Sequence, residues 1–542
     1  MKNPFSWTLS VQMNRDTIDK SIAYLRNHFN QIILVVLGLI SVIAFIHYYR
    51  NGLGIAYNDA RSHLDISRRV VESLKPGLAQ IGSVWLPLPH ILMLPTIWND
   101  WMWHSGLSGA IPSMASYIFT GFLVVKYLAR LGISRLGQFA AVLILAGNLN
   151  MVYLQATAMT EILLMATMTA AAYHFLCWVN DRQILSLVNA ALWTSLASLV
   201  RYDGWFLFVL LMLLIGVIQF IRKKKESIEG YVIIFATLAG FGIFLWVLWN
   251  TLIFRDPLYF ISGPYSARAQ QKILENENKL PTKGNWSFSL YTYSLGTVFN
   301  IGLFPIVLGI LGLIALMSDK EQKKSTKLAT LALIAPFVFN VITLYMGQSV
   351  LYLQGITQET WFNVRYGLLS LPGVAIWIGY LVDKARIAKV AILVVILMSV
   401  VFMHTSSDAV TIDDGKVGAS QKNVYEVSDW LGKYAGDEPG FVLISASSHD
   451  AILFSSGLKM KRFIHEGTGK YWEYAGQDPA KWARWIVMRT NDVNDNTFRL
   501  MRDNGQLFKY DLVQQYPFAD IYSLKSEYMK DLITEPILGK QK

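Results

Sequence analysis

Charged residues are scarce in this chain of 542 amino acids: Asp, Glu, Lys and Arg make up 16% of it, against 53% hydrophobic residues. Cysteine is nearly absent, and the single Cys177 excludes an intramolecular disulfide framework. No internal repeat or low-complexity tract is apparent. The first 31 residues are polar and basic, so we expect no cleavable signal peptide. The distribution of the many apolar residues therefore carries most of the structural information.

Apolar residues gather in runs that are long enough to cross a membrane as helices. A soluble domain has no need of repeated apolar runs close to 20 residues long, whereas a membrane helix requires about that length. Eleven such runs lie at 32–49, 110–129, 136–154, 161–179, 185–200, 205–221, 231–253, 296–317, 328–347, 366–382 and 388–404. The sequence therefore predicts a polytopic α-helical membrane protein with about 11 transmembrane helices.

Lys and Arg are concentrated in alternate loops between these runs. Basic clusters follow the second, sixth, eighth and tenth runs, at 126–135, 222–225, 320–327 and 384–389. Because cytoplasmic loops carry the excess of Lys and Arg, these loops are predicted to lie on the cytoplasmic side. The net charge of +11 is then mostly a signal of membrane topology, and no nucleic-acid partner is expected.

The C-terminal part of the chain changes character. Beyond residue 423 the apolar stretches shorten to strand length, as at 441–445, with helical stretches between them. With eleven spans, this part falls on the extracytoplasmic side. The expected domains are a membrane domain at 1–404, with outer loops at 50–109 and 254–295, and a small extracytoplasmic α/β domain at 405–542.

Unusual polar residues share one membrane face in this topology. The first outer loop and the outer ends of later spans hold Asp59, His63, Asp65, Glu161, Arg201, Asp203, Arg365 and Tyr366. Ionisable residues at the membrane are costly, and they usually have a function. Their position opposite the Lys clusters predicts an active site on the extracytoplasmic face.

Four segments of the chain carry a resemblance to a known family: 57–60, 85–90, 201–205 and 363–367. An Asp in the first outer loop, an acidic residue at the start of the helix after the third span and an amphipathic first loop are similar to those of GT-C glycosyltransferases. The pattern resembles the bacterial relatives of protein O-mannosyltransferases and aminoarabinose transferases, over about residues 30–405. The resemblance implies a multi-pass enzyme of the bacterial cytoplasmic (inner) membrane. Such an enzyme moves a sugar from a polyprenyl-phosphate donor to a glycan, lipid or protein acceptor.

Asp59 is the residue that the resemblance singles out as the general base of an inverting transfer. A base has to remove the proton of the acceptor hydroxyl while the lipid phosphate leaves. The other interpretation of Asp59 is a helix cap or an ion-pair partner. Many relatives have Asp-Glu at this place, whereas here Asn58 precedes Asp59 and Ala60 follows it. A second carboxylate, where one is needed, then has to come from Asp65 or Glu161.

Three other side chains of the predicted site each allow more than one role. Glu161 assists catalysis or binds a metal ion, and its place at the start of a span also suits a helix N-terminus. His63, on the same helical face as Asp59, binds phosphate or a metal ion or makes a structural hydrogen bond. Asp65 is a candidate for substrate binding, although arginines at i,i+4 spacing favour an ion pair.

Metal dependence is left open by the sequence. Asp59, His63 and Glu161 are the candidates for a divalent metal ion, but no compact ligand spacing supports a site. No other cofactor is expected.

Fixed cations are expected where the lipid phosphate leaves, since arginine binds phosphate bidentately and keeps its charge. Arg201 and Arg365 lie beside aromatic residues at the outer ends of spans, and Tyr366 is grouped with them as a substrate- or phosphate-binding residue. Asp203 belongs to the same group, and a local ion pair between Arg201 and Asp203 is the alternative.

Two other classes of protein fit a polytopic chain surrounded by membrane lipids. A transporter or flippase would usually show pseudo-symmetric halves and charges near mid-span, whereas here the polar residues lie at one face. A non-catalytic subunit of polysaccharide assembly would bind glycans through its outer domain without turnover. The sequence favours the glycosyltransferase, and it reveals neither the sugar nor the acceptor.

Overall fold

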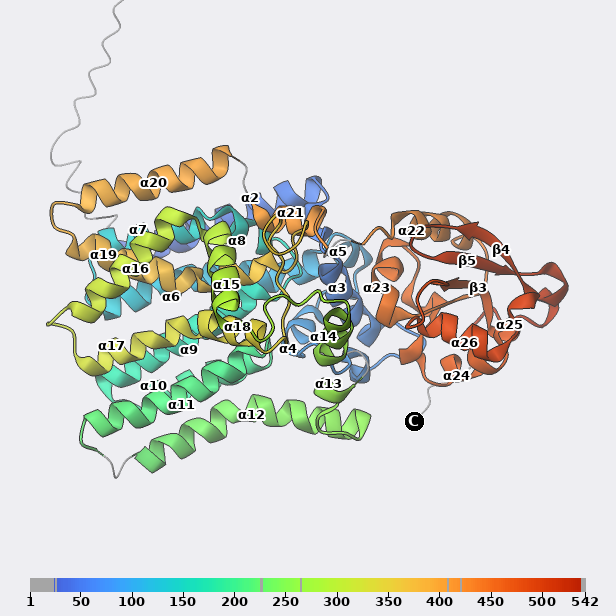
Figure 1. The fold of residues 1–542 in the computed structure, drawn as a ribbon, viewed down its shortest axis with the longest axis horizontal. Coiled ribbons are helices and arrows are strands. Elements are labelled where there is room, and N and C mark those ends of the chain that lie inside the picture. Colours follow the sequence, from blue (N-terminus) through green and yellow to red (C-terminus); the bar gives the residue numbers. More distant parts are fainter. Residues whose placement is uncertain are drawn as a thin grey trace, which may run out of the picture.

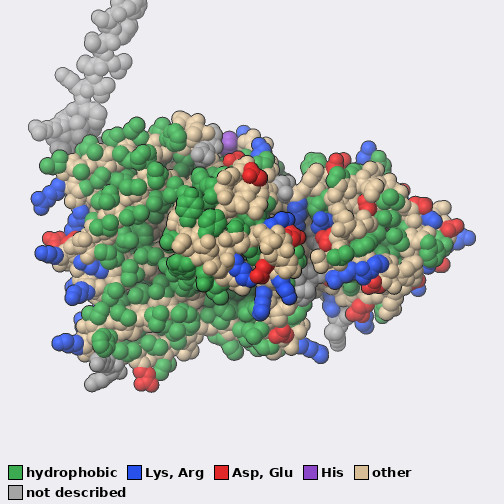
Figure 2. Space-filling view, in the orientation of Figure 1, with side chains coloured by type: hydrophobic (Ala, Val, Ile, Leu, Met, Phe, Trp, Pro, Cys, Tyr) green, Lys and Arg blue, Asp and Glu red, His purple; other side chains and the backbone are tan. Residues whose placement is uncertain are grey.

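The structure is a computed structural model that describes Tyr24 and residues 27–224, 228–263, 266–406, 409–419 and 422–537. The expectation about a signal peptide rests on the first 31 residues, and most of them lie outside the described residues. Lys225, in the basic cluster at 222–225, also lies outside them. A bundle of apolar helices, the helical domain, comprises the described residues up to 419, and a sheet domain at 422–537 extends from one end of it (Figure 1). Hydrophobic side chains cover most of the visible surface of the bundle, whereas charged side chains mark its far end and the sheet domain (Figure 2).

Eight helices of the described chain are long and apolar enough to cross a membrane. They are α2 (Phe29–Arg50), α6 (Leu107–Arg130), α9 (Glu161–Asp181), α11 (Asp203–Ile221), α12 (Ile228–Phe254) and the runs Lys324–Tyr345, Val364–Lys384 and Lys389–Lys416. These runs comprise α17 (Lys324–Thr330), η4 (Leu331–Ile334) and α18 (Ala335–Tyr345); η5 (Val364–Ser370) and α19 (Leu371–Lys384); and α20 (Lys389–Thr405) and α21 (Val410–Lys416). The prediction of a polytopic helical membrane protein is confirmed.

Two predicted spans correspond to shorter apolar helices. The run at 136–154 forms α7 (Arg135–Ala146) and then α8 (Leu149–Leu154), and the run at 185–200 forms α10 (Ile184–Ser198).

The run predicted as a single span at 296–317 is divided between two helices. Among the described residues, α15 (Trp286–Ile301) and α16 (Leu303–Ser318) meet at an angle of 109°. Gly302 between them has a φ of +96°, which a residue with a side chain rarely adopts. Pro305 has no N–H group to continue the helical hydrogen bonds across the break. Counting the bent pair as one span gives up to nine spans in the described chain, so the count of eleven stays a prediction.

The loops on the side of the sheet domain contain short helices. The amphipathic first loop holds η1 (Leu53–Ile55), α3 (Asn58–Val71), η2 (Leu78–Ile81), α4 (Leu88–Met93) and α5 (Asp100–His104). The loop after α12 holds α13 (Tyr259–Ser262) and α14 (Ala267–Asn276). Helix α3 carries all three predicted site residues of this loop, and it lies where the helical domain meets the sheet domain (Figure 1).

The sheet domain contains five strands in the order β2-β1-β3-β5-β4. Strands β1 (Phe441–Ile444), β2 (Phe463–Ile464) and β3 (Ala483–Met488) are parallel, whereas β5 (Asp520–Leu524) and β4 (Tyr510–Gln515) continue the sheet antiparallel. Its helices are α22 (Tyr425–Trp430), α23 (Ala446–Ser455), α24 (Lys470–Gln477), α25 (Pro479–Trp482) and α26 (Asn496–Asn504). All four residues of β1 are buried, as expected for a central strand covered on both faces. The predicted α/β character of this part is confirmed.

Helix α21 packs on the helical domain, although it follows residue 405, where the predicted second domain begins. Its Thr411 donates a backbone hydrogen bond to Asn150 Oδ1 at 3.0 Å. The sheet domain is attached instead through α3, where Arg69 Nη1 lies 2.6 Å from Asp450 Oδ1 and Arg61 donates to Ser455 Oγ at 3.3 Å. Helix α3 of the first loop therefore contributes contacts that hold the two domains together.

Close packing at Gly367 generates a prediction about stability. A Cβ atom at this position would lie 2.3 Å from the carbonyl oxygen of Gly296 in α15, so Gly367→Ala has to push α15 away from η5. Overpacking of this kind typically costs about 1–3 kcal/mol. We expect a lower unfolding temperature in detergent, measured by intrinsic fluorescence.

The matched control is Gly216→Ala in α11, where an added Cβ meets no atom within 4 Å. Equal unfolding temperatures for the Gly367 and Gly216 variants would contradict the close packing.

Candidate active site

A buried arginine lies at the centre of the predicted site. Asn363, in the left-handed conformation at φ +55°, turns the chain into η5, whose second residue is Arg365. Arg365 Nη2 lies 2.6 Å from Asp59 Oδ2, Nε lies 3.0 Å from Glu161 Oε1, and Nη1 lies 3.6 Å from Asp414 Oδ2. Only 3% of the Arg365 side chain is exposed. Three carboxylates from distant parts of the chain thus surround one guanidinium.

Helix starts position two of these carboxylates. Asp59 lies in the first turn of α3, and Glu161 is the first residue of α9. Negative side chains are favoured there by the helix dipole. The residue preceding α3 is Tyr57, so the ion-pair interpretation of Asp59 fits its contacts and the cap interpretation does not. Asp59 remains 37% exposed, whereas Glu161 is fully buried.

Arg201 is the second cation of the site. It lies between α10 and α11, with Nη1 3.3 Å from Glu161 Oε1 and Nε 3.3 Å from Asp203 Oδ2. The Arg201 guanidinium lies 4.4 Å from the centre of the Tyr366 ring, and its side chain is 20% exposed. The predicted local pair with Asp203 is therefore present, and Glu161 also binds both arginines.

Asp414 of α21 belongs to the same cluster, although it was not among the predicted site residues. The Tyr57 hydroxyl donates to Asp414 Oδ2 at 3.2 Å and to the carbonyl oxygen of Thr411 at 2.7 Å. Burial raises the pKa of Tyr57 well above its ordinary value, and the charge of Asp414 raises it further. The Tyr57 ring faces Arg365, with 5.0 Å between the guanidinium carbon and the ring centre.

Several buried polar atoms of this cluster have no hydrogen-bond partner among the described residues. They include Arg365 Nη1, Glu161 Oε2 and both amide atoms of Asn58. Leaving such a group unsatisfied costs about 1–3 kcal/mol. The site therefore retains hydrogen-bonding capacity next to Asp59.

His63 makes the structural hydrogen bond that was one of its predicted roles. Its Nδ1 lies 2.8 Å from His90 Nε2, and the Trp85 ring packs against it at 4.3 Å between ring centres. Burial, followed by the charges of Arg365 and Arg201, lowers the pKa of His63 to about 3. Both histidines are therefore neutral at pH 7, since burial also lowers the pKa of His90.

Asp65 is the predicted site residue that the structure places elsewhere. Its Oδ1 accepts a hydrogen bond from Trp103 Nε1 at 3.0 Å. Burial raises its pKa well above the usual range, and the charge of Asp450 in the sheet domain raises it further. Among the described residues, Asp65 makes no hydrogen bond or ion pair with the Arg365 cluster, so its assignment to substrate binding is not supported by its position. Glu161 is the second carboxylate near Asp59.

The described residues contain no group of three or more His, Cys, Asp or Glu side chains that could hold a metal ion. The candidate trio Asp59, His63 and Glu161 accordingly does not form such a group. Instead, Asp59 and Glu161 bind Arg365, and His63 binds His90.

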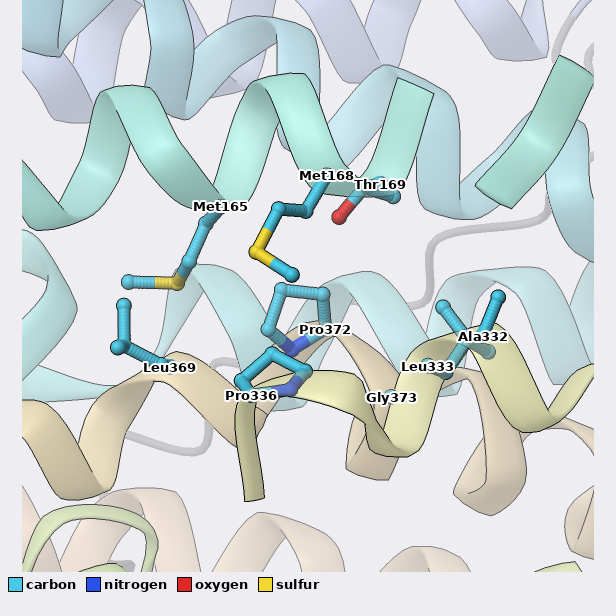
Figure 3. A pocket seen from close by; sticks show the side chains of 9 residues that line it. All are labelled: Met165, Met168, Thr169, Ala332, Leu333, Pro336, Leu369, Pro372 and Gly373. Atoms are coloured by element: carbon cyan, nitrogen blue, oxygen red, sulfur yellow. The ribbon is translucent and has the colours of Figure 1, made fainter. Parts of the chain in front are cut away.

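A small pocket inside the bundle is separate from this cluster. Figure 3 shows Met165, Met168 and Thr169 of α9 facing Pro336 of α18 and Pro372 of α19. None of its lining residues carries a charge. The pocket therefore offers no group for acid–base or phosphate chemistry.

Comparison with known proteins identifies the fold. The sequence matches no protein-family model and no curated protein. The crystal structure of ArnT from Cupriavidus metallidurans bound to undecaprenyl phosphate is 9% identical and superposes with a TM-score of 0.57, over 91% of this chain and 98% of that one. ArnT in the apo state gives 11% identity and a TM-score of 0.53, over 90% and 98%.

The Archaeoglobus fulgidus oligosaccharyltransferase with Zn and sulfate is 12% identical, with a TM-score of 0.48 over 84% of this chain and 67% of that one. The likeness to ArnT establishes the fold. It confirms the fold that the resemblance to GT-C glycosyltransferases implies.

The buried histidine pair generates a prediction about pH. The unfolded chain binds a proton at His63 below about pH 6.5, whereas the folded chain does so only near pH 3, so stability falls as the pH drops below 6.5. At pH 5 this single group lowers the free energy of unfolding by about 2 kcal/mol. We expect the unfolding temperature of His63→Gln to fall less between pH 7 and pH 5 than that of the natural protein.

His404→Gln, at an exposed position near the end of α20, is the control and should keep the natural pH dependence. Identical acid profiles for the His63 variant and the natural protein would show that His63 is not buried in its neutral form.

Proposed function

We propose that this protein is an inverting glycosyltransferase that moves a sugar from a polyprenyl-phosphate donor to an acceptor hydroxyl. The observation that carries the proposal is the Asp59–Arg365 pair at 2.6 Å, at the junction of the helical domain and the sheet domain. A carboxylate in partial contact with solvent and a buried guanidinium supply the two groups that the reaction needs. The shared fold with ArnT bound to undecaprenyl phosphate supports a lipid-linked donor.

Asp59 is the general base in this proposal. The acceptor oxygen attacks the anomeric carbon of the sugar while the bond from that carbon to the phosphate oxygen breaks. The lipid phosphate leaves with the bonding electron pair, and the acceptor proton moves to the Asp59 carboxylate. The 37% exposure of the Asp59 side chain leaves room for a hydroxyl to approach.

Arg365 and Arg201 bind the phosphate and stabilise its charge as it leaves. Arg365 Nη1 has no hydrogen-bond partner among the described residues, and Arg201 is the more exposed of the two cations. A phosphate that binds both Nη1 and Nη2 of Arg365 would displace Asp59 from this guanidinium. Donor binding would then prepare the base for the acceptor.

The remaining predicted residues act through the arginines. Glu161 accepts hydrogen bonds from both guanidinium groups, and Asp203 fixes Arg201. Tyr366 lies beside Arg201, while neutral His63 supports the wall of the site as a hydrogen-bonding group. Glu161 is therefore a positioning residue in this proposal.

The reaction is proposed to occur on the extracytoplasmic side of a bacterial cytoplasmic membrane. The basic clusters lie in the loops at the end of the bundle opposite the sheet domain, where Lys and Arg side chains are visible at the edge of the molecule (Figures 1 and 2). The positive-inside rule assigns that end to the cytoplasm. The Asp59–Arg365 pair and the sheet domain are then outside.

Two substitutions separate binding from chemistry. Asp59→Asn should lower turnover by about 10²–10⁴-fold, the usual contribution of a general base, and should leave binding of undecaprenyl phosphate intact. Arg201→Gln should weaken lipid binding instead. Turnover is measured with the lipid-linked sugar that co-purifies with the protein, identified by mass spectrometry, and with cell-envelope extract as acceptor.

Asp256→Asn, at a partly exposed position, and Arg268→Gln, at an exposed one, lie in the loop after α12. They are the matched controls and should behave like the natural protein. Unchanged turnover after Asp59→Asn would remove Asp59 as the base. Binding of glycan or lipid by the natural protein without any turnover would favour one of the two other classes, a non-catalytic subunit of polysaccharide assembly or a transporter.

A further inference from the structure

The start of α21 is held by a side chain from another helix. Its N-cap residue is Ala409, which has no side-chain oxygen to accept a hydrogen bond from the first helical turn. Asn150 of α8 supplies such an acceptor: its Oδ1 accepts from Thr411 N at 3.0 Å and from Thr411 Oγ1 at 2.7 Å. Asn150 and Thr411 are both fully buried. The position of α21 therefore depends on the Asn150 amide group.

The other end of the same amide group binds the bend between α15 and α16. The chain turns at Gly302, and the last carbonyl groups of a helix lack partners within it. The backbone carbonyl oxygen of Asn300, next to the last residue of α15, accepts from Asn150 Nδ2 at 3.0 Å and from Asn148 Nδ2 at 2.8 Å. Asn150 thus connects α21 with the bent end of α15.

Asn300 connects this bend with η5. Its Nδ2 donates to the carbonyl oxygen of Val364 at 2.7 Å and to that of Gly296 at 2.7 Å. Val364 immediately precedes Arg365, so the first of these hydrogen bonds fixes the peptide group that joins the two residues. Asn300 is fully buried as well. The bend between two apolar helices therefore holds the segment that carries the central cation.

The two asparagines link the two sides of the contact between Asp414 and Arg365. Asp414 lies in α21, three residues after Thr411, and its Oδ2 is 3.6 Å from Arg365 Nη1. At this separation the contact is an attraction between charges and no hydrogen bond fixes it. The positions of the α21 and η5 backbones therefore decide how Asp414 shares the guanidinium with Asp59 and Glu161.

We propose that Asn150 and Asn300 are positioning residues of the transfer reaction, which hold Arg365 in η5 and Asp414 in α21 in their places. This inference rests on the proposed transferase function, because it names residues that serve that reaction through the cation that binds the phosphate. A displacement of about 1 Å in a group that acts on the substrate can lower the rate about 100-fold. Loss of a hydrogen bond behind Arg365 should therefore reach the chemistry.

The first test changes one hydroxyl group at Thr411. Thr411→Val keeps the shape of the side chain but removes the hydrogen bond to Asn150 Oδ1, whereas Thr411→Ser keeps the hydroxyl group. We expect turnover of the co-purified lipid-linked sugar with cell-envelope extract to fall about tenfold in the valine variant, the effect of one lost hydrogen bond. The serine variant should retain most of the turnover. Thr194→Val, which removes a fully buried hydroxyl that donates to Ala190 O within α10 at 2.7 Å, should not change it.

The second test removes the amide group itself. Asn150→Ala loses the connections to both α21 and α15 and should lower turnover by about 100-fold. Asn250→Ala in α12 is the matched control, because it removes an equally buried amide whose Nδ2 donates to Trp246 O of the same helix at 2.9 Å. The double variant of Asn150→Ala and Thr411→Val should be no slower than Asn150→Ala alone, since both changes remove the same hydrogen bond.

Turnover is expressed per lipid-binding site, counted by isothermal titration of undecaprenyl phosphate into the full-length protein in nanodiscs. Unfolded protein lowers the number of sites, whereas loss of positioning lowers the turnover of each site. Unchanged turnover per site in Thr411→Val, equal losses in the valine and serine variants, or equal losses in Asn150→Ala and Asn250→Ala would each overturn the proposal. Full turnover in the natural protein and in both Thr411→Val and Asn150→Ala would contradict the positioning role alone. A natural protein that binds the lipid without any turnover would count against the transferase function, and with it against the reaction that these residues are proposed to serve.

Discussion

The rest of the site depends on one interaction, the burial of the Arg365 guanidinium among the carboxylates of Asp59, Glu161 and Asp414. A buried cation is costly unless it is paired and hydrogen-bonded, so these carboxylates have to reach it from α3, α9 and α21. This pairing brings the amphipathic first loop and the segment after α20 to the same point. Substitution of Arg365 by an apolar residue would leave several carboxylates without their counter-charge.

The same guanidinium couples the two halves of the proposed reaction. Its Nη2 binds Asp59, the proposed base, and its Nη1 has no hydrogen-bond partner among the described residues. In the proposed reaction, a lipid phosphate and the base Asp59 would compete for one group, so that donor binding would release the base. The neighbouring Arg201 offers a second cation at the exposed side of the cluster. The shared fold with ArnT is compatible with this reaction, but the contacts of this chain are what support it.

Much of this arrangement is predictable from the sequence, because membrane topology alone brings alternate loops to one face. Glu161, Arg201 and Arg365 follow from that alternation and are found together. Asp65 does not join them, since at about 100° per residue it lies roughly 120° around α3 from Asp59 and faces the sheet domain. Asp414 was missed because its contact depends on α21 packing back on the helical domain, which no local pattern encodes. The sequence does signal the break between α15 and α16 through Gly302 and Pro305, whereas the polar edge strand β4 lacks a clear alternation.

The most direct test of the account is an experimental structure of the protein with bound undecaprenyl phosphate, determined by cryo-electron microscopy in nanodiscs. We predict that the phosphate lies within hydrogen-bonding distance of Arg365 and Arg201, and that the Asp59 carboxylate no longer contacts Arg365 Nη2. A phosphate bound elsewhere, with the Asp59–Arg365 pair intact, would contradict the central claim that one guanidinium serves both the base and the leaving group.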